Sequence, residues 1–249
     1  MEFKAIYVMW KRQLKRFSRN RARMVVSLFQ PIMFLVAFGF GFGPMFDENG
    51  LSYLQFLAPG IITMTILFGS VMNGAETIMD KQFGFLKETL VAPVSRNSIM
   101  LGKTLGGATI AVLQGFLIFG LTLMLGFEVY DWALVIPAIL VMFAVAMFYT
   151  SLGIALASKV DDMQAFPMIM NFFIMPTFFL SGALFPLANL PSALEFLTRF
   201  NPLVYGVDAI RGLLTGYYVI GIWVDLIVLV PLIIGMIILG AWSFSKIEA

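Results

Sequence analysis

Long intervals without a charged residue are the feature that most constrains this chain. Because a helix rises about 1.5 Å per residue, about 20 apolar residues cross a hydrocarbon core about 30 Å thick. The interval 212–224 is too short for this, and 163–194 is too long for one upright helix. None of the intervals alternates as barrel strands do. The sequence therefore predicts an all-α membrane protein with six transmembrane helices, within residues 24–46, 49–75, 104–127, 132–158, 163–194 and 226–245.

The composition excludes most soluble classes. Hydrophobic residues make up 60% of the chain and charged residues 12%, whereas soluble domains average about 45–50% and about 25%. The chain has no cysteine and no histidine, which removes disulfides, thiolate nucleophiles and the commonest general base. We expect no catalytic residue, no metal and no cofactor in this chain, and no nucleic-acid partner.

Basic residues are unevenly distributed among the loops. The segment before the first span holds eight lysines and arginines, and the 76–103 connection holds four. Cytoplasmic loops retain such residues, so both termini are predicted to be cytoplasmic in a multi-pass protein. Only Arg199 and Arg211 fall in connections predicted to lie on the non-cytoplasmic side of the membrane. A basic region of this length does not match a signal peptide, so the first helix is expected to stay in the mature protein.

Residues 1–23 are expected to form an amphipathic elbow helix before the first span. Apolar residues recur on one face at helical spacing, with bases on the others. Such a helix lies in the headgroup plane, close to anionic membrane lipids. It is either a topology signal alone or a helix that also touches a cytosolic partner. The apolar face holds Phe3, Ile6, Tyr7, Trp10, Leu14 and Phe17.

Residues 76–103 are the longest polar stretch and cover the end of span two and a cytosolic segment. Glu76 and Asp80 are like charges one helical turn apart. Glu76 is the charge deepest in a span, where it either pairs with a base of the elbow helix or extends toward water. A short helix follows and ends at Pro93. It suits docking into a groove of another protein; the alternative is an ordinary loop.

Residues 181–225 are rich in proline and glycine yet remain apolar. This combination predicts short re-entrant helices that dip into the outer leaflet, where irregular backbone must be buried in protein. Asp208 and Arg211 are three residues apart on one helical face and could pair with each other. Outside these segments we find no soluble domain, so residues 1–249 are read as a single transmembrane domain.

The spans contain no arrangement of residues that indicates catalysis or energy conversion. Gly102-Lys103-Thr104 resembles the end of a P-loop, but the glycine required at position 97 is Asn97. Gly102 and Gly106 are therefore interpreted as a pair that lets helices pack closely. Every charged residue lies at or outside a span end, so energy for active transport would come from outside this chain.

Methionine and phenylalanine gather in spans two and five, and the span interiors also hold neutral polar side chains. Gln114 and Asn171 lie near mid-membrane, where they either hydrogen-bond between helices or line a substrate path. The methionines and phenylalanines are either lipid-facing or line an adaptable apolar cavity. The candidate path residues are Met64, Phe68, Met72, Asn171, Phe172 and Met175.

Two stretches resemble the permease subunits of ABC type-2 exporters, in the bacterial and archaeal drug- and lipid-efflux group. Residues 180–216 are similar to the family's outer re-entrant region, above all in the string 201–212. Residues 76–103 look like its cytosolic coupling segment, with Phe85 where the family often has threonine. The matching residues there are Gly84, Leu86, Glu88, Leu90, Pro93, Ser95, Arg96, Gly102 and Lys103.

The resemblance implies a partner, an assembly and a location. Two such subunits, identical or sister chains, pair in a prokaryotic cell membrane, and each carries a separate cytosolic ABC ATPase that holds ATP and Mg. Spans two and five would flank the path, and ATP-driven closure would expel an amphipathic drug or lipid by alternating access. The segment from 81 to 92 would sit in the ATPase, with coupling residues Gly84, Phe85, Leu86, Lys87, Glu88, Leu90 and Pro93.

Other functions remain open at this point. The same family also moves polysaccharides, glycolipids and ions. A membrane-embedded transferase would need acid and base groups near one face, which a chain without histidine and with few carboxylates poorly supplies. A channel or secondary carrier would normally place charge at mid-membrane or form a selectivity ring.

Overall fold

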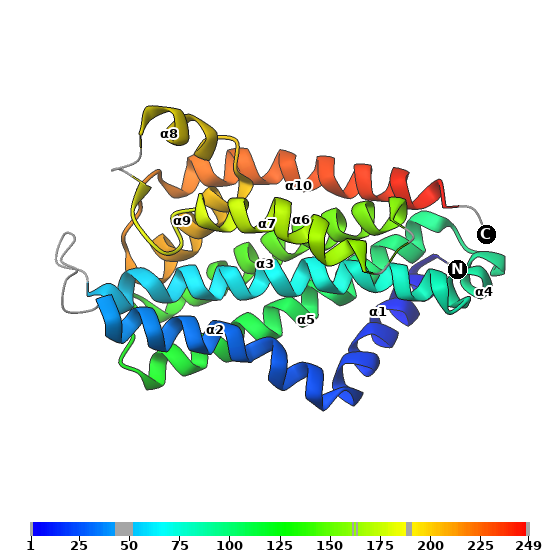
Figure 1. Ribbon diagram of the computed structural model, residues 1–249, viewed down its shortest axis with the longest axis horizontal. Coiled ribbons are helices and arrows are strands. Elements are labelled where there is room, and N and C mark those ends of the chain that lie inside the picture. Colours follow the sequence, from blue (N-terminus) through cyan, green and yellow to red (C-terminus); the bar gives the residue numbers. More distant parts are fainter. Residues whose placement is uncertain (1, 43–51, 161, 163, 188–190, 248–249) are drawn as a thin grey trace.

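The computed structural model describes residues 2–42, 52–160, 162, 164–187 and 191–247, which form helices joined by turns. The long helices lie side by side in one elongated bundle (Figure 1). This confirms the all-α fold class for the described residues. Five helices are long and apolar enough to cross a membrane: α2 (Arg21–Phe42), α3 (Tyr53–Gln82), α5 (Arg96–Met124), α6 (Val135–Lys159) and α10 (Ile222–Ser245).

The predicted span within 163–194 is represented by α7 (Ala165–Phe179), which is shorter than the other five. Its 15 residues rise roughly 22 Å at 1.5 Å per residue, less than the core thickness of about 30 Å. A turn at 180–182 follows it. The described residues thus contain five candidate spans, and the count of six stays a prediction.

Helix α3 lies at the centre of the bundle and packs against α5, α6 and α9 (Pro202–Thr215). In the apolar window of α3, 78% of the residues are buried, against 11% in α2. Two glycines permit the close crossing of α3 and α6, because a Cβ atom on Gly74 would lie 2.7 Å from the Cα atom of Gly153. The polar residues of α3 are therefore held against several neighbouring helices.

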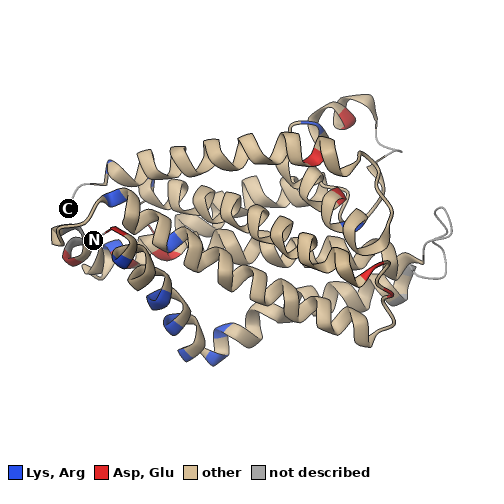
Figure 2. Cartoon of the chain, turned by 180° about the vertical axis from the view of Figure 1, so that it is seen from behind, with Lys and Arg blue, Asp and Glu red and all other residues tan. Residues whose placement is uncertain are grey.

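Helices α1 (Glu2–Arg19) and α4 (Phe85–Val91) lie at one end of the bundle, together with both ends of the described chain (Figure 1). Lysines and arginines gather at this end (Figure 2). We call this the α4 end. Gly84 separates α3 from α4 with a φ of 74°, a left-handed conformation that suits glycine. Helix α4 then ends before Pro93, as the sequence predicted.

Helix α1 packs closely against α5 through the predicted pair of small residues. Cβ atoms on Gly102 and Gly106 would lie 2.6 and 2.7 Å from the Cβ atoms of Met9 and Gln13. The prediction that this pair lets helices approach is thus confirmed, and its partner is the elbow helix. The position of α1 in the headgroup plane stays a prediction.

The opposite end of the bundle carries α8 (Ser192–Thr198) and α9 (Figure 1), and we call it the α9 end. The Asn201 side chain caps α9 by accepting a hydrogen bond from the Leu203 amide at 3.0 Å, and Gly216 ends it with a φ of 77°. A short 3₁₀ turn, η2 (Trp132–Leu134), precedes α6 at this end. Helices α8 and α9 are too short to cross a membrane, and their depth in the outer leaflet stays a prediction.

Candidate functional site

A cavity of about 390 Å³ lies between α2, α3, α5 and α7, and we call it the mid-bundle cavity. Phe172 is among the predicted path residues but does not line it, and its side chain is 74% exposed on the outside of α7. The other five predicted path residues do line it: Met64, Phe68, Met72, Asn171 and Met175. The structure thus brings together methionines, a phenylalanine and an amide from two separate helices.

Amide side chains both brace this cavity and face it. Asn73 Nδ2 donates to the Gly107 carbonyl at 3.1 Å, which links α3 to α5. Gln114 Nε2 donates to Ser27 Oγ at 2.6 Å, which links α5 to α2. Gln114 Oε1 is buried and has no hydrogen-bond partner among the described residues. Gln114 therefore makes the interhelical hydrogen bond that was one of the two alternatives, and it also lines the cavity; its place on a substrate path stays a prediction.

A second cavity of about 290 Å³ lies on the α4-end side of the first, and we call it the mouth cavity. Its walls come from the α1–α2 connection, α3 and the start of α7, and they include Arg16, Glu76 and Phe166. Arg23 and Met72 line both cavities. The two spaces therefore adjoin at these two side chains.

An ion-pair cluster of six side chains stands beside the mouth cavity, and we call it the charge cluster. The Asp80 carboxylate lies 2.9 Å from Arg12 Nη2, 3.2 Å from Arg16 Nη1 and 2.6 Å from Lys103 Nζ. Its side chain is 3% exposed and that of Lys103 is 2% exposed. A buried charge is tolerated when it is paired in this way, so the cluster fixes α1 and α5 to the end of α3.

Glu76 is the second anion of the charge cluster. It is paired with Arg23, and Arg16 Nη1 lies 3.6 Å from its Oε2. The partners of Glu76 thus include a base of the elbow helix, one of the two alternatives left by the sequence. Arg23 Nη2 also donates to Asn73 Oδ1 at 3.0 Å.

Sequence reasoning missed the roles of Asp80 and Lys103 in this cluster. The sequence did contain a signal. Two carboxylates, Glu76 and Asp80, lie one helical turn apart at the end of span two, and eight basic residues precede span one on the same predicted side of the membrane. Lys103 bonds to Asp80 and to the Thr77 hydroxyl, at 3.2 Å.

Two of the predicted coupling residues hold α4 onto the bundle. Leu86 was expected at the docking surface, but it is 2% exposed and belongs to a small apolar core that includes Met9, Ile99 and Phe244. Leu86 thus anchors α4 to the bundle, and its role in coupling stays a prediction. Phe85 is half-buried with the Arg12 guanidinium 3.4 Å from its ring centroid. Both residues therefore have a supporting contact within this chain.

The outward surface of α4 is formed by other residues. Glu88 and Pro93 are exposed, Gly84 is half-buried, and the side chains of Lys87 and Leu90 lie outside the described part of the structure. Phe83 precedes α4 and Val91 is its last residue, and they are 79% and 83% exposed. Sequence reasoning did not single them out, because the sequence of this mixed segment does not show which apolar side chains face outward.

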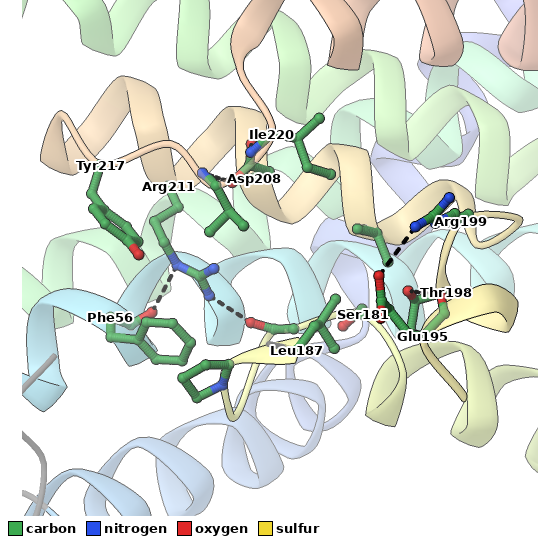
Figure 3. Close-up of a pocket in the computed structure, with 14 residues that line it drawn as sticks. Phe56, Ser181, Leu187, Glu195, Thr198, Arg199, Asp208, Arg211, Tyr217 and Ile220 are labelled. Carbon is green, nitrogen blue, oxygen red and sulfur yellow. Dashed lines mark hydrogen bonds and ion pairs between the residues drawn. The ribbon is translucent and has the colours of Figure 1, made fainter. Parts of the chain in front are cut away.

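The α9 end contains a third cavity, of about 350 Å³, around two buried charges (Figure 3). Asp208 accepts hydrogen bonds from the amides of Val219, Ile220 and Gly221 at 2.8, 2.9 and 3.1 Å. Arg211 donates to the carbonyls of Phe56 and Gly182 at 3.3 and 2.7 Å. These contacts hold turns and loops in place, and the direct pairing of Asp208 with Arg211 stays a prediction.

Comparison with known proteins assigns the bundle to a family. The family model described as ABC-2 type transporter matches residues 4–215. The chain belongs to the ABC-2 type transporter family. It is 28% identical to the inner membrane transport permease YadH of Escherichia coli over 83% of this chain and 81% of YadH. It is 30% identical to ycf38 of Cyanophora paradoxa, which carries the name of a transport permease, over 83% of this chain and 72% of ycf38.

Family membership fixes the general role of the chain. A third relative is nodulation protein J of Rhizobium leguminosarum bv. viciae, 27% identical over 83% of this chain and 81% of that protein. ABC-2 permeases are non-catalytic membrane subunits and normally work with an ATPase partner. The chain is thus a multi-pass transport permease of the cell membrane, as its apolar helices also require.

Proposed function

We propose that this chain is the permease subunit of an ATP-driven exporter that moves an amphipathic or hydrophobic molecule, such as a drug or a lipid, out of the cytoplasm. The observation that carries the proposal is the mid-bundle cavity, which lies among membrane-spanning helices and is lined by Met64, Phe68 and Met175. Flexible thioethers and aromatic rings adapt to varied apolar ligands. The amides of Asn73 and Gln114 add polar contacts along the same wall.

The ATPase partner docks at the α4 end, which faces the cytoplasm together with both termini. Phe83 and Val91 are exposed apolar residues on the two sides of the exposed Glu88 in sequence. Contiguous apolar surface outside the bilayer marks an interaction site, and we propose that these side chains contribute to one. ATP and Mg are held by the partner, and this chain supplies no cofactor site.

A second permease, either an identical copy or a sister chain, faces α2 and α7. These helices form part of the wall of the mid-bundle cavity. Both present apolar surface outward, including Val26 and Phe29 on α2 and Met168 and Phe172 on α7. Two such surfaces brought together would enclose a path between the subunits, and alternating access would occur at this interface.

The experiment is ATP-driven export by the permease–ATPase complex reconstituted in liposomes. Met64→Trp fills the mid-bundle cavity, and export of a hydrophobic dye is expected to stop while the complex still assembles. The matched control is Leu113→Trp, because Leu113 lies on α5 and its side chain is 51% exposed. Equal export by the two variants, with normal assembly, would exclude the cavity as the path.

A further inference from the structure

The charge cluster beside the mouth cavity is not electrically balanced. Its cations are Arg12, Arg16, Arg23 and Lys103, and its anions are Glu76 and Asp80. Among these six described side chains, four positive and two negative charges leave an excess of two positive charges. Electrostatic interactions are stronger near a low-dielectric interior than in water, so this excess favours an anion at the mouth cavity.

Two of the four cations are accessible from the mouth cavity. Lys103 is 2% exposed and bound to Asp80, so it cannot reach a ligand. Arg16 and Arg23 line the mouth cavity, and their side chains are 32% and 30% exposed. Arg23 also lines the mid-bundle cavity, where Met72 is its neighbour in both linings. A ligand that spans the two cavities would therefore pass Arg23.

The two cavities differ in chemistry along this path. The mouth cavity presents guanidinium groups, whereas the mid-bundle cavity beyond Arg23 presents Met64, Phe68 and Met175. In the mid-bundle cavity Gln114 also offers a buried carbonyl oxygen that has no hydrogen-bond partner among the described residues. A molecule that matches this order has an anionic headgroup followed by an apolar body, with a donor group near their junction.

We propose that the transported molecule is an amphipathic anion whose phosphate or carboxylate headgroup binds Arg23 and Arg16 in place of Glu76, while its apolar part lies in the mid-bundle cavity. This inference rests on the proposed export function. A guanidinium group binds planar anions through two parallel hydrogen bonds. Glu76 occupies this position in the structure, paired with both Arg23 and Arg16. The carboxylate thus acts as an internal competitor that the headgroup displaces.

The test measures binding to the full-length chain in phosphatidylcholine nanodiscs. The probes are dodecyl phosphate, dodecylphosphocholine, dodecyltrimethylammonium and inorganic phosphate, which separate the headgroup charge from the chain. We expect dodecyl phosphate to bind at least about tenfold more tightly than the other three, tenfold being 1.4 kcal/mol. Equal binding of the three amphiphiles would overturn the proposal. Inorganic phosphate binding as tightly as dodecyl phosphate would also overturn it, because the site would then hold an ion alone.

Two variants make the assignment specific to Arg23. Arg23→Gln is expected to remove the preference for dodecyl phosphate, whereas Arg21→Gln is expected to keep it, because Arg21 is an exposed base two positions away. Glu76→Gln removes the competitor and is expected to tighten binding several-fold. Unchanged selectivity in Arg23→Gln would contradict the proposal.

Export assays separate this inference from the proposed function. If the complex exports a neutral hydrophobic dye but the chain shows no preference for dodecyl phosphate, the inference fails and the export function stands. If the chain shows the preference but no ATPase complex exports any substrate, the proposed function fails, and the inference that this anion is transported fails with it.

Discussion

The two ends of the bundle bury charge in different ways. At the α4 end, Asp80 binds three cationic side chains that belong to α1 and α5. At the α9 end, Asp208 and Arg211 bind backbone amides and carbonyls of turns and loops. Asp80 and Asp208 are each 3% exposed. Side-chain pairs between elements can exchange partners, whereas backbone contacts fix the path of a loop. We therefore expect movement and partner binding at the α4 end and structural support at the α9 end.

The largest expected effect is at the α4 end. Asp80→Asn would leave Lys103 buried without its anion, and breaking such a pair costs about 3–5 kcal/mol of unfolding free energy. We expect a large fall in melting temperature in detergent, measured by the loss of monodisperse protein on heating. The control is Glu195→Gln, since the Glu195–Arg199 pair is 52% and 70% exposed and such pairs contribute about 0–1 kcal/mol. Equal melting temperatures for both variants would break the comparison.

The matching change at the α9 end is Asp208→Asn. The amide keeps the shape but retains one acceptor oxygen, so at least one of the three backbone amides loses its partner. An unsatisfied buried donor costs about 1–3 kcal/mol. We expect a moderate fall in melting temperature and faster proteolysis within 216–221, with export retained in the folded fraction. Glu128→Gln, an exposed carboxylate at the same end, serves as the control. Loss of export at normal stability would show that the α9 end is more than support.

Sequence reasoning recovered the helices far better than the contacts among charged side chains. Uncharged intervals set where helices run, because each residue of a span must be apolar regardless of its neighbours. Six path residues were chosen because of their residue type and because they lie in spans two and five. Five of them line one cavity in the structure. The burial of Leu86 was not foreseen, since the side of α4 that faces the bundle depends on how Gly84 turns the chain. Lys103 and Asp80 lie 23 positions apart in sequence, and only the packing of α5 on α3 brings them together.

A smaller effect is expected for partner binding alone. Phe83→Ser removes a side chain that is 79% exposed, so stability should be unchanged. If Phe83 is a docking residue, its loss should weaken ATPase binding by about tenfold, as for interface residues worth more than about 1 kcal/mol. Co-purification at a series of ATPase concentrations measures this. Phe196→Ser on α8, where the phenylalanine is 59% exposed, should leave ATPase binding unchanged. If the Phe196 variant weakens binding as much as the Phe83 variant, docking is not specific to the α4 end.

The smallest effect concerns the contact between the start of α1 and the start of α5. Glu2 accepts hydrogen bonds from the hydroxyls of Ser98 and Ser95, and these hold the pKa of Glu2 below its ordinary value. A depressed pKa in the folded state gives stability that is present at neutral pH and is lost as pH falls through that pKa. Glu2→Gln should therefore melt slightly below the unmodified chain at pH 7, and the difference should vanish in acid. A difference that persists or grows in acid would contradict this contact.

The central claim is that an ATPase engages the α4 end from the cytoplasm. The chain contains no cysteine, so a single cysteine can be introduced at Val91 on α4 or at Phe196 on α8 and cross-linked in native membranes. The account predicts that Val91→Cys forms a cross-link to the ATPase subunit and that Phe196→Cys does not. A cross-link from Phe196→Cys, or none from Val91→Cys in a complex that still exports substrate, would contradict it.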